Sequence, residues 1–104
     1  MALTEWMPTA PALGVVILDG AVDVTSLSRL NAELEGRIAV GTQVLVVDVG
    51  KVELIDSSAL GALASAAQRL RQERSGSLVL RNASARLLHQ LRLMRLDHVF
   101  ELEI

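Results

Sequence analysis

The feature that most constrains the fold of this chain is a run of apolar, largely β-branched residues, Val44-Leu45-Val46-Val47-Asp48-Val49, which Gly50 closes. Its length and composition are typical of a buried strand. From Leu60 onward, apolar residues recur at helical spacing until Ser75-Gly76, which predicts a helix from about residue 57 to residue 74. A buried strand that leads directly into a long helix indicates a parallel sheet covered by helices.

The same alternation of strand and helix extends along the rest of the chain. The predicted strands lie at residues 3–7, 14–19, 44–49, 78–80 and 99–102. The other two predicted helices follow the capping cluster Asp23–Ser26 and a cap at Asn82 or Ser84. Because crossovers between parallel strands are right-handed, successive helices can lie on the same side of the sheet.

We therefore expect an α/β fold with a mixed, mostly parallel sheet of four to five strands and helices mainly on one face. The length of 104 residues fits a single domain, with residues 1–13 as an N-terminal strand and loop and residues 14–102 as the core.

Composition excludes several classes of function. The net charge is −2, and Trp6 and Phe100 are the only aromatic residues, so a direct nucleic-acid partner is not expected. The absence of cysteine excludes disulfides and thiolate chemistry, and we expect neither a metal site nor a cofactor. No apolar run approaches membrane-spanning length and the N-terminus lacks a positively charged signal region. These features predict a cytoplasmic protein without membrane insertion.

The candidate site is the triplet Asp56-Ser57-Ser58, which falls at the start of the predicted central helix. Unpaired backbone N–H groups and the positive end of the helix dipole favour short polar and anionic side chains there. Position alone allows two interpretations, simple helix capping or a regulated phosphorylation site. A Ser-His-Asp hydrolase arrangement is disfavoured, because no spacing in the chain brings His89 to Ser58. We expect no enzymatic activity.

At this point the sequence resembles the STAS domain, the family of sulphate transporter and anti-sigma factor antagonist domains. The central segment Val46–Gly61, with Asp56-Ser57-Ser58 inside it, resembles the signature of the family and is the most specific of four matching pieces. The other three are residues 18–23, 76–80 and 87–100. Three positions depart from the family pattern: Ala21, Ala59 and the segment Met94-Arg95-Leu96.

The resemblance implies an anti-sigma factor antagonist that acts through partner switching. In such proteins the unphosphorylated form binds an anti-sigma factor, itself a serine kinase, and thereby releases a sigma factor. Phosphorylation of the residue that matches Ser58 blocks binding, and a PP2C-type phosphatase reverses the mark. The resemblance further implies a partner-binding surface made of Asp23, Asp56, Ser57, Ser58 and Ala59.

Two alternatives from other classes remain open. A STAS domain can serve as an accessory subunit of a lipid or solute transporter ATPase, or as a scaffold unit in a multi-STAS signalling assembly. The intact Asp-Ser-Ser triplet favours the switch. The cluster of Arg69, Arg71 and Arg74 is interpreted as a solvated helix face.

Overall fold

The computed structural model describes residues 13–103 and contains a four-stranded sheet in the order β1-β2-β3-β4. All three strand pairs are parallel. The elements in chain order are β1 (Leu13–Val22), the short 3-10 helix η2 (Val24–Ser26), α1 (Leu27–Ala39), β2 (Val44–Ile55), α2 (Ser57–Arg74), β3 (Ser77–Arg81), α3 (Ala85–Leu93) and β4 (Glu101–Glu103). The first strand expected at residues 3–7 lies outside the described residues.

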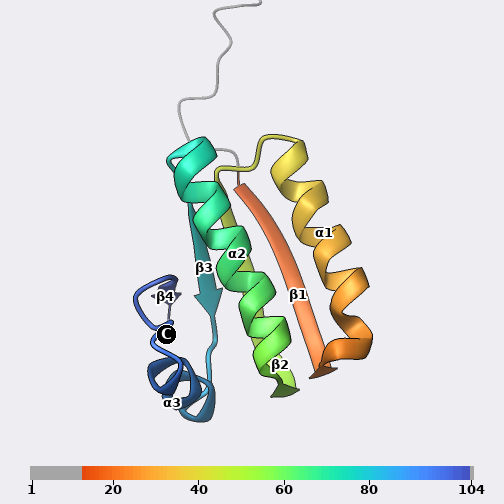
Figure 1. Ribbon diagram of the computed structural model, residues 1–104, viewed down its shortest axis with the longest axis vertical. Coiled ribbons are helices and arrows are strands. Elements are labelled where there is room, and N and C mark those ends of the chain that lie inside the picture. Colours follow the sequence, from red (N-terminus) through yellow and green to blue (C-terminus); the bar gives the residue numbers. More distant parts are fainter. Residues whose placement is uncertain (1–12, 104) are drawn as a thin grey trace, which may run out of the picture.

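Each of the three α-helices connects two neighbouring strands, as the predicted α/β topology requires. Figure 1 shows α1 and α2 side by side over the same face of the sheet, while α3 lies near the end of β3 and β4. The predicted α/β class is confirmed, and so is the placement of helices mainly on one face. The physical reason is that a right-handed crossover between adjacent parallel strands returns the chain on the same side each time.

The core lies between that face of the sheet and the helices. Val16, Val47 and Leu80 share one register row across the first three strands and are all buried. The helices supply mostly leucine and alanine to the same core, namely Leu30, Leu34, Ile38, Ala59, Leu60, Leu63, Ala64, Ala66, Ala67, Leu70, Leu87 and Leu91. Small alanines on α2 let this helix approach the sheet closely, so a core with a single described aromatic residue, Phe100, can still be dense.

The boundaries of β1 and β2 differ from the sequence prediction. The predicted end of β2 at Gly50 is wrong, since the strand continues through Ile55 and pairs with β1 up to Val22. The pairing contains two register shifts, and Gly20 adopts a left-handed φ of 64° within β1. Neither Gly20 nor Gly50 ends its strand, because β1 and β2 continue to pair beyond both glycines. The longer β1–β2 ribbon carries the chain to the start of α2.

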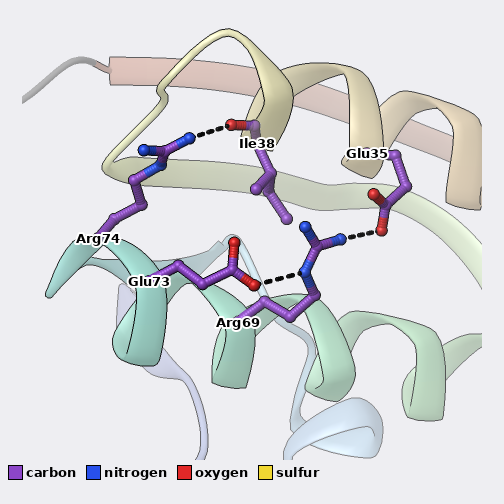
Figure 2. Close-up of polar contacts among 5 residues, drawn as sticks. All are labelled: Glu35, Ile38, Arg69, Glu73 and Arg74. Atoms are coloured by element: carbon purple, nitrogen blue, oxygen red, sulfur yellow. Dashed lines mark hydrogen bonds and ion pairs between the residues drawn. The ribbon is translucent and has the colours of Figure 1, made fainter.

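The basic cluster on α2 is not the free solvated face that the sequence predicted. Figure 2 shows Arg69 paired with Glu35 on α1 and with Glu73 on its own helix. Arg74 donates to the carbonyl of Ile38 at 3.1 Å, and Arg71 donates to the carbonyl of Val99 at 3.2 Å. These guanidinium groups therefore connect α2 to the segments beside it, although the side chains stay partly exposed.

Candidate functional site

The candidate site lies where β1 and β2 end and the next helices begin. The backbone N–H of Asp56 donates to the carbonyl of Val22 at 3.1 Å, so the last residue of β1 is joined to the residue that precedes α2. The first turns of η2 and α2 therefore lie at the same carboxyl edge of the sheet.

Asp56 caps α2 and holds the hydroxyl of Ser58. Its Oδ1 accepts a hydrogen bond from the backbone N–H of Ala59 at 2.9 Å and another from Ser58 Oγ at 2.8 Å. The Ala59 N–H lowers the pKa of the Asp56 carboxyl most strongly, followed by the Ser58 hydroxyl, and the backbone N–H of Val24 adds to the effect. The carboxylate is therefore anionic at neutral pH.

The two serines are open to solvent, whereas the residue after them is not. Ser57 and Ser58 are the first two residues of α2 and both are exposed. Ala59 has 0% of its surface exposed, so its methyl group belongs to the core and its backbone N–H is already used by Asp56. This position does not favour the direct contact between Ala59 and a partner that the resemblance implied.

Asp23 is brought to the same edge as Ser58. It caps η2 and accepts hydrogen bonds from the backbone N–H of Thr25 at 2.9 Å and from Thr25 Oγ1 at 2.5 Å. It directly follows Val22, whose carbonyl binds Asp56. Two carboxylates and two serine hydroxyls thus gather at one end of the sheet.

Two exposed apolar side chains at this edge were missed by the sequence analysis. Val24 in η2 is 67% exposed and Leu54 near the end of β2 is 54% exposed. Their neighbours Val22 and Ile55 are each 5% exposed and point into the core. Extending the predicted strand from Gly50 to Ile55 would have revealed Leu54, because strand alternation with Ile55 inward places Leu54 outward.

The site is an open surface. Asp56, Ser57 and Ser58 line neither the groove between β1 and α1 nor the smaller hollow between β2 and α3.

The described part of the chain was also searched for metal sites and membrane spans. Within residues 13–103 there is no group of three or more histidine or acidic side chains that could hold a metal ion. None of the helices in that same range is long and apolar enough to cross a membrane. An exposed hydroxyl beside an anionic cap can accept a phosphoryl group from an enzyme that docks over it.

The family of the chain follows from a comparison with family models. A model described as "Mlab, STAS domain" matches residues 8–103. The chain belongs to the STAS domain family. No protein of curated function matches its sequence.

Solved STAS structures share the fold of this chain. An anti-sigma factor antagonist from Mycobacterium paratuberculosis is 22% identical with a TM-score of 0.78, over 92% of this chain and 80% of that one. The Bacillus cell fate determinant SpoIIAA in its phosphorylated form is 15% identical with a TM-score of 0.68, over 94% and 88%. The STAS domain of a SulP transporter from Vibrio cholerae is 15% identical with a TM-score of 0.71, over 97% and 80%. At these identities the likeness shows the fold alone.

Proposed function

We propose that this STAS protein is an anti-sigma factor antagonist switched by phosphorylation of Ser58. In its unphosphorylated form it binds an anti-sigma factor that is also a serine kinase, and a sigma factor is released. The kinase phosphorylates Ser58 and ends the interaction, and a PP2C-type phosphatase restores it. The protein acts in the cytoplasm and has no enzymatic activity of its own.

The observation that carries this proposal is the exposed hydroxyl of Ser58 at the first turn of α2, 2.8 Å from Asp56 Oδ1. A kinase can reach this hydroxyl without unfolding any part of the domain. Solved structures of the same fold include SpoIIAA in an unphosphorylated and in a phosphorylated form. This pair supports the view that a domain of this fold can carry a phosphate and stay folded.

The physical effect of the phosphate is expected at the interface and not in the fold. A phosphoserine carries about −1.5 to −2 charges at pH 7. At a helix N-terminus such a charge is favourable by about 0.3–1 kcal/mol, which offsets part of the repulsion from the Asp56 carboxylate. A partner that closes over Ser58 would have to strip water from this charge next to two carboxylates. That cost is large enough to lower affinity by orders of magnitude.

A pull-down from the native host tests the proposal. The baits are wild type, Ser58→Ala, Ser58→Glu and, as a matched control, Ser65→Glu, which adds the same charge at an exposed serine two turns further along α2. We expect wild type, Ser58→Ala and Ser65→Glu to retain an anti-sigma factor with a kinase domain, and Ser58→Glu to lose it. Retention by all four baits, or by none, would refute the switch.

A second candidate function is supported by the solved transporter domains. The STAS domain of the Vibrio cholerae SulP transporter and a sulfate transporter family protein from Wolinella succinogenes, with a TM-score of 0.70, share this fold. Under this alternative the chain is an accessory subunit that binds a transporter constitutively, and the resemblance stated above implies a transporter ATPase as that partner. The same pull-down would then recover a transporter ATPase equally with every bait.

A further inference from the structure

We propose that the exposed face of α3 is a docking surface for an acidic segment of the anti-sigma factor. This face carries Arg86, His89 and Arg92, and Arg95 extends it just beyond the end of the helix. The inference rests on the proposed function and specifies the chemistry of the partner. That chemistry is a set of carboxylates on a protein surface, which guanidinium groups bind with two parallel hydrogen bonds.

The first line of evidence is the segregation of charge along the chain. The net charge of the chain is −2, yet residues 75–96 hold four arginines and no acidic residue. One of the four, Arg81, pairs with an acidic side chain of β4. The other three, Arg86, Arg92 and Arg95, make no ion pair and donate no side-chain hydrogen bond within residues 13–103. The fold therefore leaves this positive charge without a partner of its own.

The second line of evidence is the arrangement of the basic side chains on the helix. Arg86, His89 and Arg92 recur every three residues, which places them on one face of α3, and all three are exposed. Leu87 and Leu91 on the other face are buried in the core. The basic face spans about 9 Å along the helix axis. It is therefore open to a partner along its whole length.

Two of the arginines occupy positions that weaken the helix itself. Arg86 lies in the first turn of α3, where the positive end of the helix dipole disfavours a cation. Arg95 follows the C-cap Met94 and adopts a left-handed φ of 58°, a conformation that favours glycine. Residues that oppose local stability without serving the core are typical of functional sites. A face needed only for solubility would not require arginine at either position.

This face lies beside the candidate site. The Gln90 side chain of α3 donates to the carbonyl of Ile55 at 3.0 Å, and Ile55 directly precedes Asp56. Figure 1 shows α3 at the same end of the sheet as the start of α2. A specific interface buries about 800 Å² on each partner, or about 20–30 residues. A partner that covers Ser58 on this scale extends onto the segments around it, and α3 is one of them.

The charges favour an acidic protein segment over a membrane or a nucleic acid. Those two polyanions act over a long range, where the net charge of −2 opposes their approach. Electrostatic attachment to membranes commonly uses clusters of about four to eight basic residues, more than the three arginines of this face. Two or three carboxylates within about 10 Å on a partner match the length of the face and act through direct contact.

The test measures the affinity of the purified anti-sigma factor captured by the wild-type bait, by calorimetry at about 0.05 M and about 0.5 M salt. Arg86→Gln, Arg92→Gln and Arg95→Gly should each weaken binding about fivefold at the lower salt, and the triple variant about 100-fold. At the higher salt the loss in the triple variant should fall below about tenfold, because salt screens contacts between exposed charges. Arg37→Gln removes the same charge from the last turn of α1 and is the matched control, with affinity within about twofold of wild type.

Thermal melting separates a docking role from a structural one. Arg95→Gly should raise the melting temperature by about 2–5 °C, because glycine adopts the left-handed conformation without strain. A gain in stability together with a loss of affinity is the result expected of a residue that serves a partner. A lower melting temperature for Arg95→Gly would show that Arg95 supports the fold and would refute its role in docking.

The remaining outcomes are distinct. Wild-type affinity in the triple variant, or an equal loss with Arg37→Gln, would overturn the inference and leave the switch at Ser58 standing. Sedimentation of the wild-type protein with phosphatidylglycerol vesicles, lost in the triple variant, would assign the face to an anionic membrane and refute a protein partner there. Failure of the wild-type bait to capture any anti-sigma factor would overturn the proposed function and this inference together.

Discussion

The two ends of α2 use polar side chains in opposite ways. At the C-terminal end, Arg69, Arg71 and Arg74 donate to groups on neighbouring segments, and Ser75 ends the helix in a left-handed conformation with φ of 52°. At the N-terminal end, Ser58 donates only to Asp56, its own helix cap, and its side chain faces solvent. The comparison shows that polar side chains at the C-terminal end connect α2 to other segments, whereas the Ser58 hydroxyl at the N-terminal end contacts only its own helix cap and is exposed to solvent.

The largest expected effect on this comparison is a loss of stability from Gly76→Ala, just beyond the C-terminal end of α2. A Cβ at this position would overlap the backbone carbonyl oxygen of Gln43, which cannot move without shifting the start of β2. Gly76→Ala should therefore destabilise the protein by about 2–4 kcal/mol, measured by urea denaturation.

Gly61→Ala is the control for Gly76→Ala. Gly61 lies on the exposed side of α2 and a Cβ there meets nothing within 4 Å. Because alanine is the better helix former, this substitution should stabilise the protein by about 0.5–1 kcal/mol. Equal stability of the two variants would show that Gln43 and Gly76 do not approach each other as described.

A smaller effect is expected from removing the cap at the N-terminal end. Asp56→Ala leaves the Ala59 N–H without its acceptor and should lower the melting temperature by about 5 °C at pH 7. The pKa of Asp56 is lowered in the folded state, so its stabilisation is present above the unfolded pKa of about 3.9 and is lost as pH falls through the folded pKa.

The difference in melting temperature between wild type and Asp56→Ala should accordingly shrink on acidification below about pH 4. Asp19→Ala, which removes an exposed carboxylate on β1, controls for the change in net charge. A difference that grows as the pH falls would contradict an anionic cap.

The smallest effect is expected from Arg69. Its two ion pairs, with Glu35 and Glu73, are partly exposed to solvent, and pairs of this kind stabilise little. Arg69→Ala should lower the melting temperature by about 1–3 °C at low salt and by less at about 1 M salt, where screening weakens such pairs. Arg92→Ala on the exposed side of α3 is the control, and an equal decrease in both would show that Arg69 does not connect α1 to α2.

Much of the fold and part of the site could be predicted from sequence. The apolar run at 44–49 correctly predicted a strand, and the helical spacing after Leu60 correctly predicted a helix. Both patterns depend on residues that are close in the chain. The Asp56 cap was predictable for the same reason, since its acceptor and donor groups are three residues apart. The extension of β2 to Ile55 was not, because it depends on pairing with β1, more than thirty residues away.

By itself the sequence determined the alternation of strands and helices and the position of Asp56-Ser57-Ser58 at a helix start. Only the tertiary structure decided which side chains remain free: Arg69 and Arg74 are engaged, Ala59 is buried, and Val24 and Leu54 are exposed. The physical reason is the distance along the chain between the residues that interact. Helix periodicity and capping are set by neighbours within one turn, whereas exposure is set by distant segments that cover a side chain or leave it open to solvent.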